Sequence, residues 1–166
     1  MIYSDLIDTI IGKIAINWSH DDKLQIQSVK FLLDKKPDKN LFPLTKNNYL
    51  RKILKSILSP EKTLPFNYQL FNTKELSPFT NDVLKTLLKK VKKGDVISYS
   101  KLATLSGYPN AARAIGTVMA KNRFPLFIPC HRVIKNDGTT GNFLKDNPSG
   151  KEIKKKLLKL EQKKGN

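Results

Sequence analysis

The spacing of apolar residues changes part-way along the chain, and this change limits the folds that the chain can adopt. Residues 12–19 (GKIAINWS) and 24–33 (LQIQSVKFLL) alternate apolar and polar side chains, which is typical of strands, and the HDDK between them favours a turn. From residue 77 onward, apolar residues recur at helical spacing between prolines and glycines. The pattern predicts an α/β N-terminal domain over residues 1–76 and a mostly α-helical C-terminal domain over residues 77–166.

Five helices are expected from this spacing. Residues 47–58 form the first, and residues 77–91 form the second, which begins at a serine and a proline. A short helix capped by Ser100 and another over residues 110–122 flank the turn YPN, which makes a helix-turn-helix candidate. A basic amphipathic helix over residues 151–162 completes the set. A polar loop over residues 34–40 and a frayed tail over residues 163–166 are also expected.

The positive charge is unevenly distributed. The formal net charge is +17. Residues 1–76 carry 12 Lys and Arg against 8 Asp and Glu, or +4, whereas residues 77–166 carry 19 against 6, or +13. Such an excess indicates a polyanionic partner, with nucleic acid the first candidate and an anionic membrane the second. A lysine-rich composition that only keeps the chain in solution is the alternative.

The chain has one cysteine, Cys130, so an internal disulfide is excluded and a reducing compartment is expected. With no second cysteine, and with His20 the only histidine besides His131, no zinc site is expected. No apolar run is long enough to span a bilayer, and the N-terminus does not have the pattern of a secretory signal. The expected location is therefore the cytoplasm, or the nucleus in a eukaryote.

Cys130 lies in the segment PLFIPCHRVI at residues 125–134, in which PLFIPC is expected to be a buried strand or extended segment. A neighbouring imidazole or cation lowers the pKa of a thiol and makes it a nucleophile, and His131 and Arg132 follow directly. Adjacent side chains in an extended segment point in opposite directions, however. Taken alone, the segment favours an inert, buried cysteine over a nucleophile.

The helix expected over residues 110–122 has a face with almost no side chains. Ala111, Ala112, Ala114 and Gly116 would let another surface, of protein or DNA, approach closely, and Arg113 is the cation among them. The face equally suits close helix packing, with Arg113 extending to solvent.

Several motifs together resemble one family, the O6-alkylguanine-DNA alkyltransferases, which are suicide repair proteins that remove alkyl groups from guanine. The motifs are PCHRVI at residues 129–134, AARAIG at 111–116, GDVISY at 94–99, KKKLLKLE at 154–161 and, less closely, IGKIAI at 11–16. The resemblance implies a ribonuclease H-like N-terminal domain and a winged-helix-like C-terminal domain. It also implies that a monomer binds double-stranded DNA in the minor groove and rotates the damaged guanine into a pocket.

The resemblance also implies roles for individual residues. Cys130 would accept the alkyl group, His131 would act through a water as its base, and Glu161 would orient His131. Tyr99 would contact a phosphate and protonate the leaving guanine, and Asn122 would brace the turn before the active-site segment. The remaining assignments are DNA contacts at Arg113, Tyr99, Ala111, Ala112, Gly116 and Lys121, and a substrate pocket lined by Met119, Pro125, Val133, Phe143 and Leu144.

The sequence departs from the family pattern around the expected pocket. Phe143 stands where a tyrosine is common, Leu144 replaces a polar residue, and the loop between Phe143 and the last helix is about four residues longer than usual. Arg123 stands where a proline is usual. Two alternatives to the repair enzyme are a non-catalytic DNA-binding protein that senses alkyl lesions or regulates transcription, and a cysteine hydrolase with a Cys–His pair. A membrane-surface role for the basic helix at residues 151–160 is a third.

Overall fold

The computed structural model describes residues 1–33, 42–145 and 147–162, so the loop expected over residues 34–40 and the tail at 163–166 lie outside the described residues. By its contacts the chain forms two compact units. Unit 1 comprises residues 1–74 and 123–127, and unit 2 comprises residues 75–122 and 128–166. Among the described residues, no helix is both long enough and apolar enough to cross a membrane.

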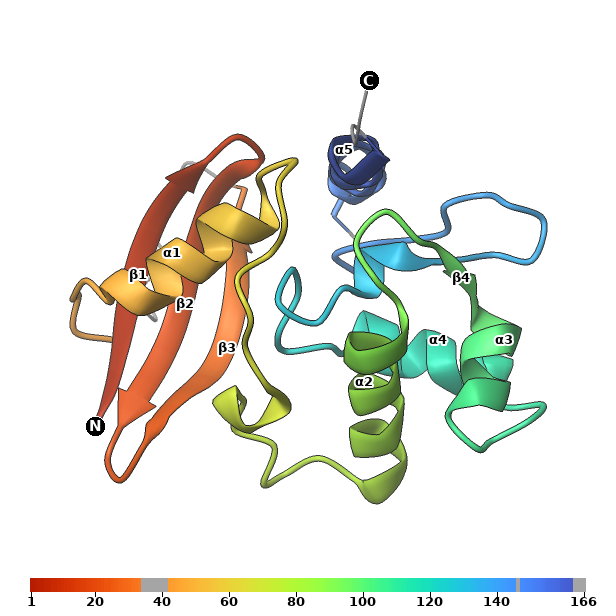
Figure 1. Ribbon diagram of the computed structural model, residues 1–166, viewed down its shortest axis with the longest axis horizontal. Helices are drawn as coiled ribbons and strands as arrows, with labels where there is room; N and C mark the ends of the chain where they lie inside the picture. Colours follow the sequence, from red (N-terminus) through yellow and green to blue (C-terminus); the bar gives the residue numbers. More distant parts are fainter. Residues whose placement is uncertain (34–41, 146, 163–166) are drawn as a thin grey trace. The chain divides into compact units, whose positions relative to one another are not determined.

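Unit 1 is built on an antiparallel sheet of three strands, β1 (Ile2–Thr9), β2 (Gly12–His20) and β3 (Leu24–Leu32), in the order β1-β2-β3. The predicted hairpin is confirmed as β2 and β3. Figure 1 shows α1 (Asn48–Ile57) lying along the sheet, and a 3-10 turn, η1 (Tyr68–Leu70), follows it. The α1 side chain Arg51 donates to buried Asp5 of β1, with Nε 2.9 Å from Oδ2, which satisfies the carboxylate. The apolar and polar residues of β1 do not alternate regularly, so this strand was not expected from the sequence.

Residues 123–127 pack into unit 1. The Val29 backbone N–H donates to the Arg123 carbonyl at 2.8 Å, and the rings of Phe124 and Phe127 lie 4.8 and 6.4 Å from that of Phe71. The segment before Cys130 is buried as predicted, but of the two predicted forms, a strand or an extended segment, the strand is wrong because the segment is irregular. Its prolines have no N–H to donate, and Leu126 has a left-handed φ of 73°, which interrupts an extended ladder.

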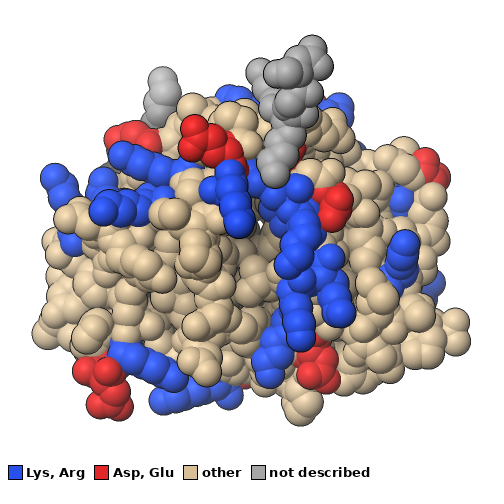
Figure 2. All heavy atoms as spheres, viewed as in Figure 1, with Lys and Arg blue, Asp and Glu red and all other residues tan. Residues whose placement is uncertain are grey.

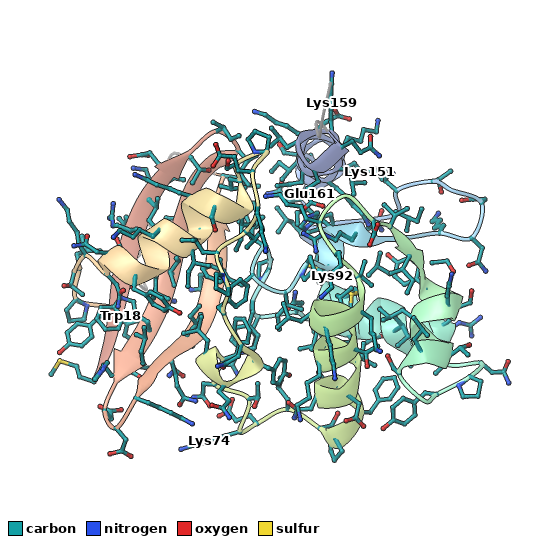
Figure 3. The ribbon with its side chains drawn as sticks, viewed as in Figure 1. Trp18, Lys74, Lys92, Lys151, Lys159 and Glu161 are labelled. Atoms are coloured by element: carbon teal, nitrogen blue, oxygen red, sulfur yellow. The ribbon has the colours of Figure 1, made fainter. Side chains whose placement is uncertain are left out.

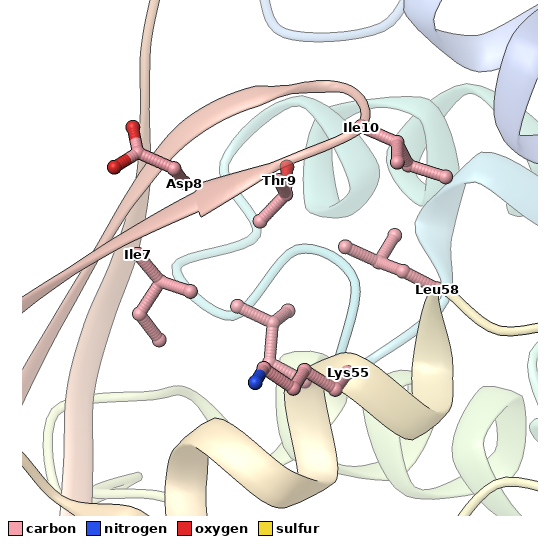
Figure 4. A pocket seen from close by; sticks show the side chains of 7 residues that line it. Ile7, Asp8, Thr9, Ile10, Lys55 and Leu58 are labelled. Atoms are coloured by element: carbon pink, nitrogen blue, oxygen red, sulfur yellow. The ribbon is translucent and has the colours of Figure 1, made fainter.

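An apolar hollow of about 430 Å³ lies on unit 1, between the end of β1 and the end of α1 (Figure 4). Its lining residues are Ile7, Asp8, Thr9, Ile10, Leu54, Lys55 and Leu58. None of the candidate site residues lines it.

Unit 2 contains four helices in its described residues: α2 (Pro78–Lys90), α3 (Tyr99–Leu105), α4 (Ala112–Ala120) and α5 (Gly150–Gln162). Ser77 caps α2 as expected, with its side chain accepting from the Thr80 N–H. The cap predicted at Ser100 is wrong: Ser98 caps α3, which therefore begins at Tyr99. Contacts between α3 and α4 confirm two short helices around the expected turn.

Two short parallel strands join segments of unit 2 that are far apart in the sequence. Strand β4 (Ile97–Ser98) pairs with β5 (Val133–Ile134), which directly follows the 3-10 turn η2 (Cys130–Arg132). The pairing brings the start of α3 next to the segment that carries Cys130. Both units together confirm a mixed α/β fold.

Candidate active site

Cys130 opens the turn η2 and is 5% exposed. Its N–H donates to the Ile128 carbonyl at 2.8 Å, and Asn122 Nδ2 donates to the same carbonyl at 3.1 Å. Asn122 therefore holds the backbone that presents the thiol. It also hydrogen-bonds the Cys130 side chain, which favours the thiolate.

A buried cluster lies next to the thiol, formed by two residues of η2 and one of α5. His131 Nε2 is 2.9 Å from Glu161 Oε1, and Arg132 donates to both carboxylate oxygens, from Nη2 at 2.8 Å and from Nε at 2.9 Å. Arg132 Nη1 also donates to the Val91 carbonyl at 2.9 Å. Figure 3 shows Glu161 on α5. The two-pronged contact of Arg132 fixes the carboxylate, and the carboxylate in turn fixes the imidazole.

The charges in this cluster follow from its contacts. Burial raises the pKa of Glu161, but the hydrogen bonds from His131 and Arg132 outweigh burial and lower the pKa to about 2. Burial lowers the pKa of His131, so its ring is neutral at pH 7, although Glu161 opposes this shift. A neutral ring facing a carboxylate carries its proton on Nε2, which leaves Nδ1 as an acceptor. No described residue hydrogen-bonds this buried Nδ1.

Lys154 of α5 is a further member of the site. It is 1% exposed, and its Nζ donates to the Val133 carbonyl at 2.6 Å. Burial lowers the pKa of Lys154 to about 8, an effect that the charge of Cys130 opposes. Burial raises the pKa of the Cys130 thiol, whereas Asn122 and Lys154 lower it. The ammonium is thus a cation placed to stabilise the thiolate.

Tyr99 and Phe143 lie around the same centre. The Tyr99 ring is half-buried at the start of α3, and burial and the charge of Cys130 both raise its pKa, so the phenol keeps its proton. A Cβ placed on Gly141 would lie 3.2 Å from Tyr99 Oη, which shows how closely the loop passes the hydroxyl. Phe143 is buried, and its ring centroid is 6.4 Å from that of His131.

The structure brings some of the sequence-predicted site residues together and leaves others apart. His131 and Glu161 share a hydrogen bond, Asn122 hydrogen-bonds the Cys130 side chain, and the charge of Cys130 acts on Tyr99. Arg113 and Lys121 are exposed on or just after α4. Ala111, Ala112, Gly116 and Met119 are half-buried there, and Leu144 is half-buried with φ 53°. Pro125 packs with unit 1.

Two members of the site were not assigned from the sequence. Lys154 falls on the same face of α5 as buried Ile153, Leu157 and Glu161, and a lysine within an apolar stripe was the available signal. Arg132 was noted only as a neighbouring cation. Its hydrogen bonds to Glu161, 29 positions away, could not be predicted from the sequence.

Known proteins resemble this chain in sequence and in fold. The family profile described as "6-O-methylguanine DNA methyltransferase, DNA binding domain" matches residues 78–163, more than half of the chain. The chain belongs to this family. A methylated-DNA–protein-cysteine methyltransferase of Thermococcus barophilus is 32% identical over 85% of this chain and 76% of its own length. That of Rattus norvegicus is 50% identical over 48% of this chain, so the chain spans only 37% of that relative.

A solved structure shares the fold across both units. The O6-methylguanine methyltransferase of Mycobacterium tuberculosis superposes with a TM-score of 0.76 over 100% of this chain and 96% of its own. The two sequences are 24% identical. This likeness establishes the fold.

Proposed function

We propose that the protein repairs DNA by transferring the alkyl group of O6-alkylguanine irreversibly to Cys130, once per molecule. The observation that carries the proposal is the buried series Cys130, His131 and Glu161, in which the ring of His131 is fixed on one side and has an accepting Nδ1 on the other. An arrangement of a nucleophile, a base and a carboxylate that orients the base activates a weak nucleophile. Membership of the family supports the same activity.

The transfer needs one proton to leave Cys130 and one to reach the guanine. The thiol proton passes through a water to His131 Nδ1, and Glu161 balances the resulting imidazolium. The thiolate Sγ then attacks the alkyl carbon, and the bond from this carbon to O6 breaks. Tyr99, which keeps its proton, donates it to the leaving base. The product is a thioether, which no group in the site reverses, and no cofactor takes part.

Several contacts suit the recognition of guanine. The Val133 carbonyl accepts from Lys154. It would also accept from the exocyclic amine of guanine, since a carbonyl oxygen has two lone pairs. Met119, Phe143 and Leu144 of unit 2 would line the pocket. Because Phe143 has no hydroxyl, this side of the pocket holds the base by apolar contact.

DNA would be bound through α4. The small residues of its face allow close approach to a minor groove, and Arg113 would fill the gap left by the rotated base. Ala111, Ala112, Gly116 and Lys121 would contribute to this contact. We propose in the same way a ribonuclease H-like N-terminal domain at residues 1–76 and a winged-helix-like domain at residues 77–166. We also propose that the protein is a monomer and that it is located in the cytoplasm or nucleus, where the thiol stays reduced.

The proposal is tested by intact mass measurement and peptide mapping after the protein is mixed with a duplex containing one O6-methylguanine. We expect a gain of one methyl group on Cys130, stopping at one per molecule, and no gain in Cys130→Ser. A protein that binds this duplex and leaves Cys130 unmodified would instead be a lesion sensor. Turnover of ester or peptide substrates would favour the hydrolase.

A further inference from the structure

Exposed lysines lie along two helices of unit 2, α2 and α5, whose C-terminal ends are close to each other. The Gly94 N–H, just after α2, lies 3.5 Å from Glu161 Oε2 near the end of α5, so the C-terminal ends of these helices are neighbours. We define the lysine ridge as five exposed residues along them: Lys89, Lys92, Lys151, Lys155 and Lys159. Figure 3 labels Lys92 beyond α2, and Lys151 and Lys159 on α5.

Few acidic side chains offset the ridge. Figure 2 shows Lys and Arg side chains in a column that follows α5 and α2, with few Asp or Glu among them. On α5, Glu161 is buried against Arg132, and only Glu152 is exposed, 3.4 Å from Lys155. Lysines four residues apart on one helix repel one another and destabilise the helix. A bound polyanion would relieve this repulsion.

The spacing of the ridge suits a nucleic-acid backbone. Lys151, Lys155 and Lys159 follow one another at four-residue intervals, which rise about 6 Å each along a helix. They therefore span about 12 Å, over which a DNA duplex carries roughly seven phosphates. Lysine neutralises phosphates as a point charge and reads no bases, so the expected binding is independent of sequence.

The ridge is separate from the surface proposed above for the damaged duplex. That surface consists of α4 residues with Arg113 and Lys121, and none of them belongs to α2 or α5. We propose that the lysine ridge binds the phosphates of a second segment of double-stranded DNA while α4 holds the first. This inference goes beyond the proposed function and rests on it only for the assignment of the first segment.

The test counts short, lesion-free duplexes bound per chain by native mass spectrometry at low salt with duplex in excess. Wild type is expected to bind two. The variant K89Q/K92Q/K155Q/K159Q is expected to bind one. A matched variant on unit 1, K46Q/K52Q/K62Q/K74Q, loses the same charge from exposed lysines and is expected to bind two. Each phosphate contact of the ridge should add about 0.9 to the salt slope of the second binding step.

Three results would overturn the inference: a single duplex on wild type, an equal loss in both variants, or binding of the ridge to anionic lipid vesicles in place of the second duplex. Methyl transfer to Cys130 is measured in parallel on an O6-methylguanine duplex and is expected at the wild-type rate in the ridge variant. Absence of transfer in every protein would refute the proposed function, whereas the duplex count would still decide the ridge.

Discussion

Lys154 donates from Nζ to the backbone carbonyl of Val133 at 2.6 Å, and the ammonium is buried. This contact joins α5 to the strand β5, three residues after the cysteine. It also places a positive charge where it stabilises the Cys130 thiolate. The last helix thus contributes two groups to the site, Lys154 for the thiol and Glu161 for the imidazole.

Lys154→Met is expected to raise the pKa of Cys130, and Asn122→Ala is expected to do the same by removing a hydrogen bond to the sulfur. A rise of about one unit makes transfer about ten-fold slower below the thiol pKa. The measurement is the single-turnover rate of methyl transfer against pH. The profile should move to higher pH in each variant.

Lys155→Met is the matched control for Lys154→Met, because Lys155 is the exposed neighbour on the same helix. Its pH profile should coincide with that of wild type. A profile that drops in height for Lys154→Met without moving along the pH axis would contradict an electrostatic role of Lys154.

Glu161→Gln is expected to destabilise the fold by about 3 kcal/mol at pH 7, because Arg132 is left buried without its counter-charge. The pKa of Glu161 is lowered in the folded state from 4.5 to about 2, so its stabilising contribution is present above pH 4.5 and is lost as the pH falls through 2. Urea unfolding between pH 7 and 2 should show this loss in wild type and not in Glu161→Gln. Glu152, which is exposed and pairs with Lys155, serves as the comparison. Glu152→Gln should change the free energy of unfolding by less than about 1 kcal/mol.

The parts of the fold that the sequence predicted are those governed by local spacing. The hairpin of β2 and β3 and the helix capped by Ser77 follow from alternation and capping chemistry. Strand β1 could not be predicted this way, because its polar Asp5 is buried, and the carboxylate is satisfied by the Arg51 side chain and the Asn47 N–H, 46 and 42 positions away. The cysteine, histidine and glutamate were assigned through the family motifs. Lys154 was missed because only tertiary packing shows that its amine turns inward to Val133.

Tyr99→Phe is expected to slow transfer at least ten-fold and to leave the fold unchanged, since a positioned proton donor contributes a factor of about 10² or more. The phenol is protonated over the whole neutral range because its pKa is raised. The loss of rate in Tyr99→Phe, relative to wild type, should therefore depend on the leaving group. It should be smaller for methyl transfer from a base that leaves without gaining a proton than for transfer from guanine. Equal losses for both substrates would assign Tyr99 to DNA contact alone.

Gly116→Ala separates the stability of α4 from its proposed contact with DNA. Beyond its chain neighbours and the backbone of its own helix, a Cβ at Gly116 meets no atom of the described structure within 4 Å, so the fold accepts alanine. Replacing a helix-interior glycine should stabilise the protein by up to about 1 kcal/mol. The added methyl group would nevertheless stand between α4 and the minor groove, and DNA affinity should fall several-fold. Thermal unfolding and duplex titration give the two readouts, and an unchanged affinity would mean that the small-residue face of α4 does not meet the DNA.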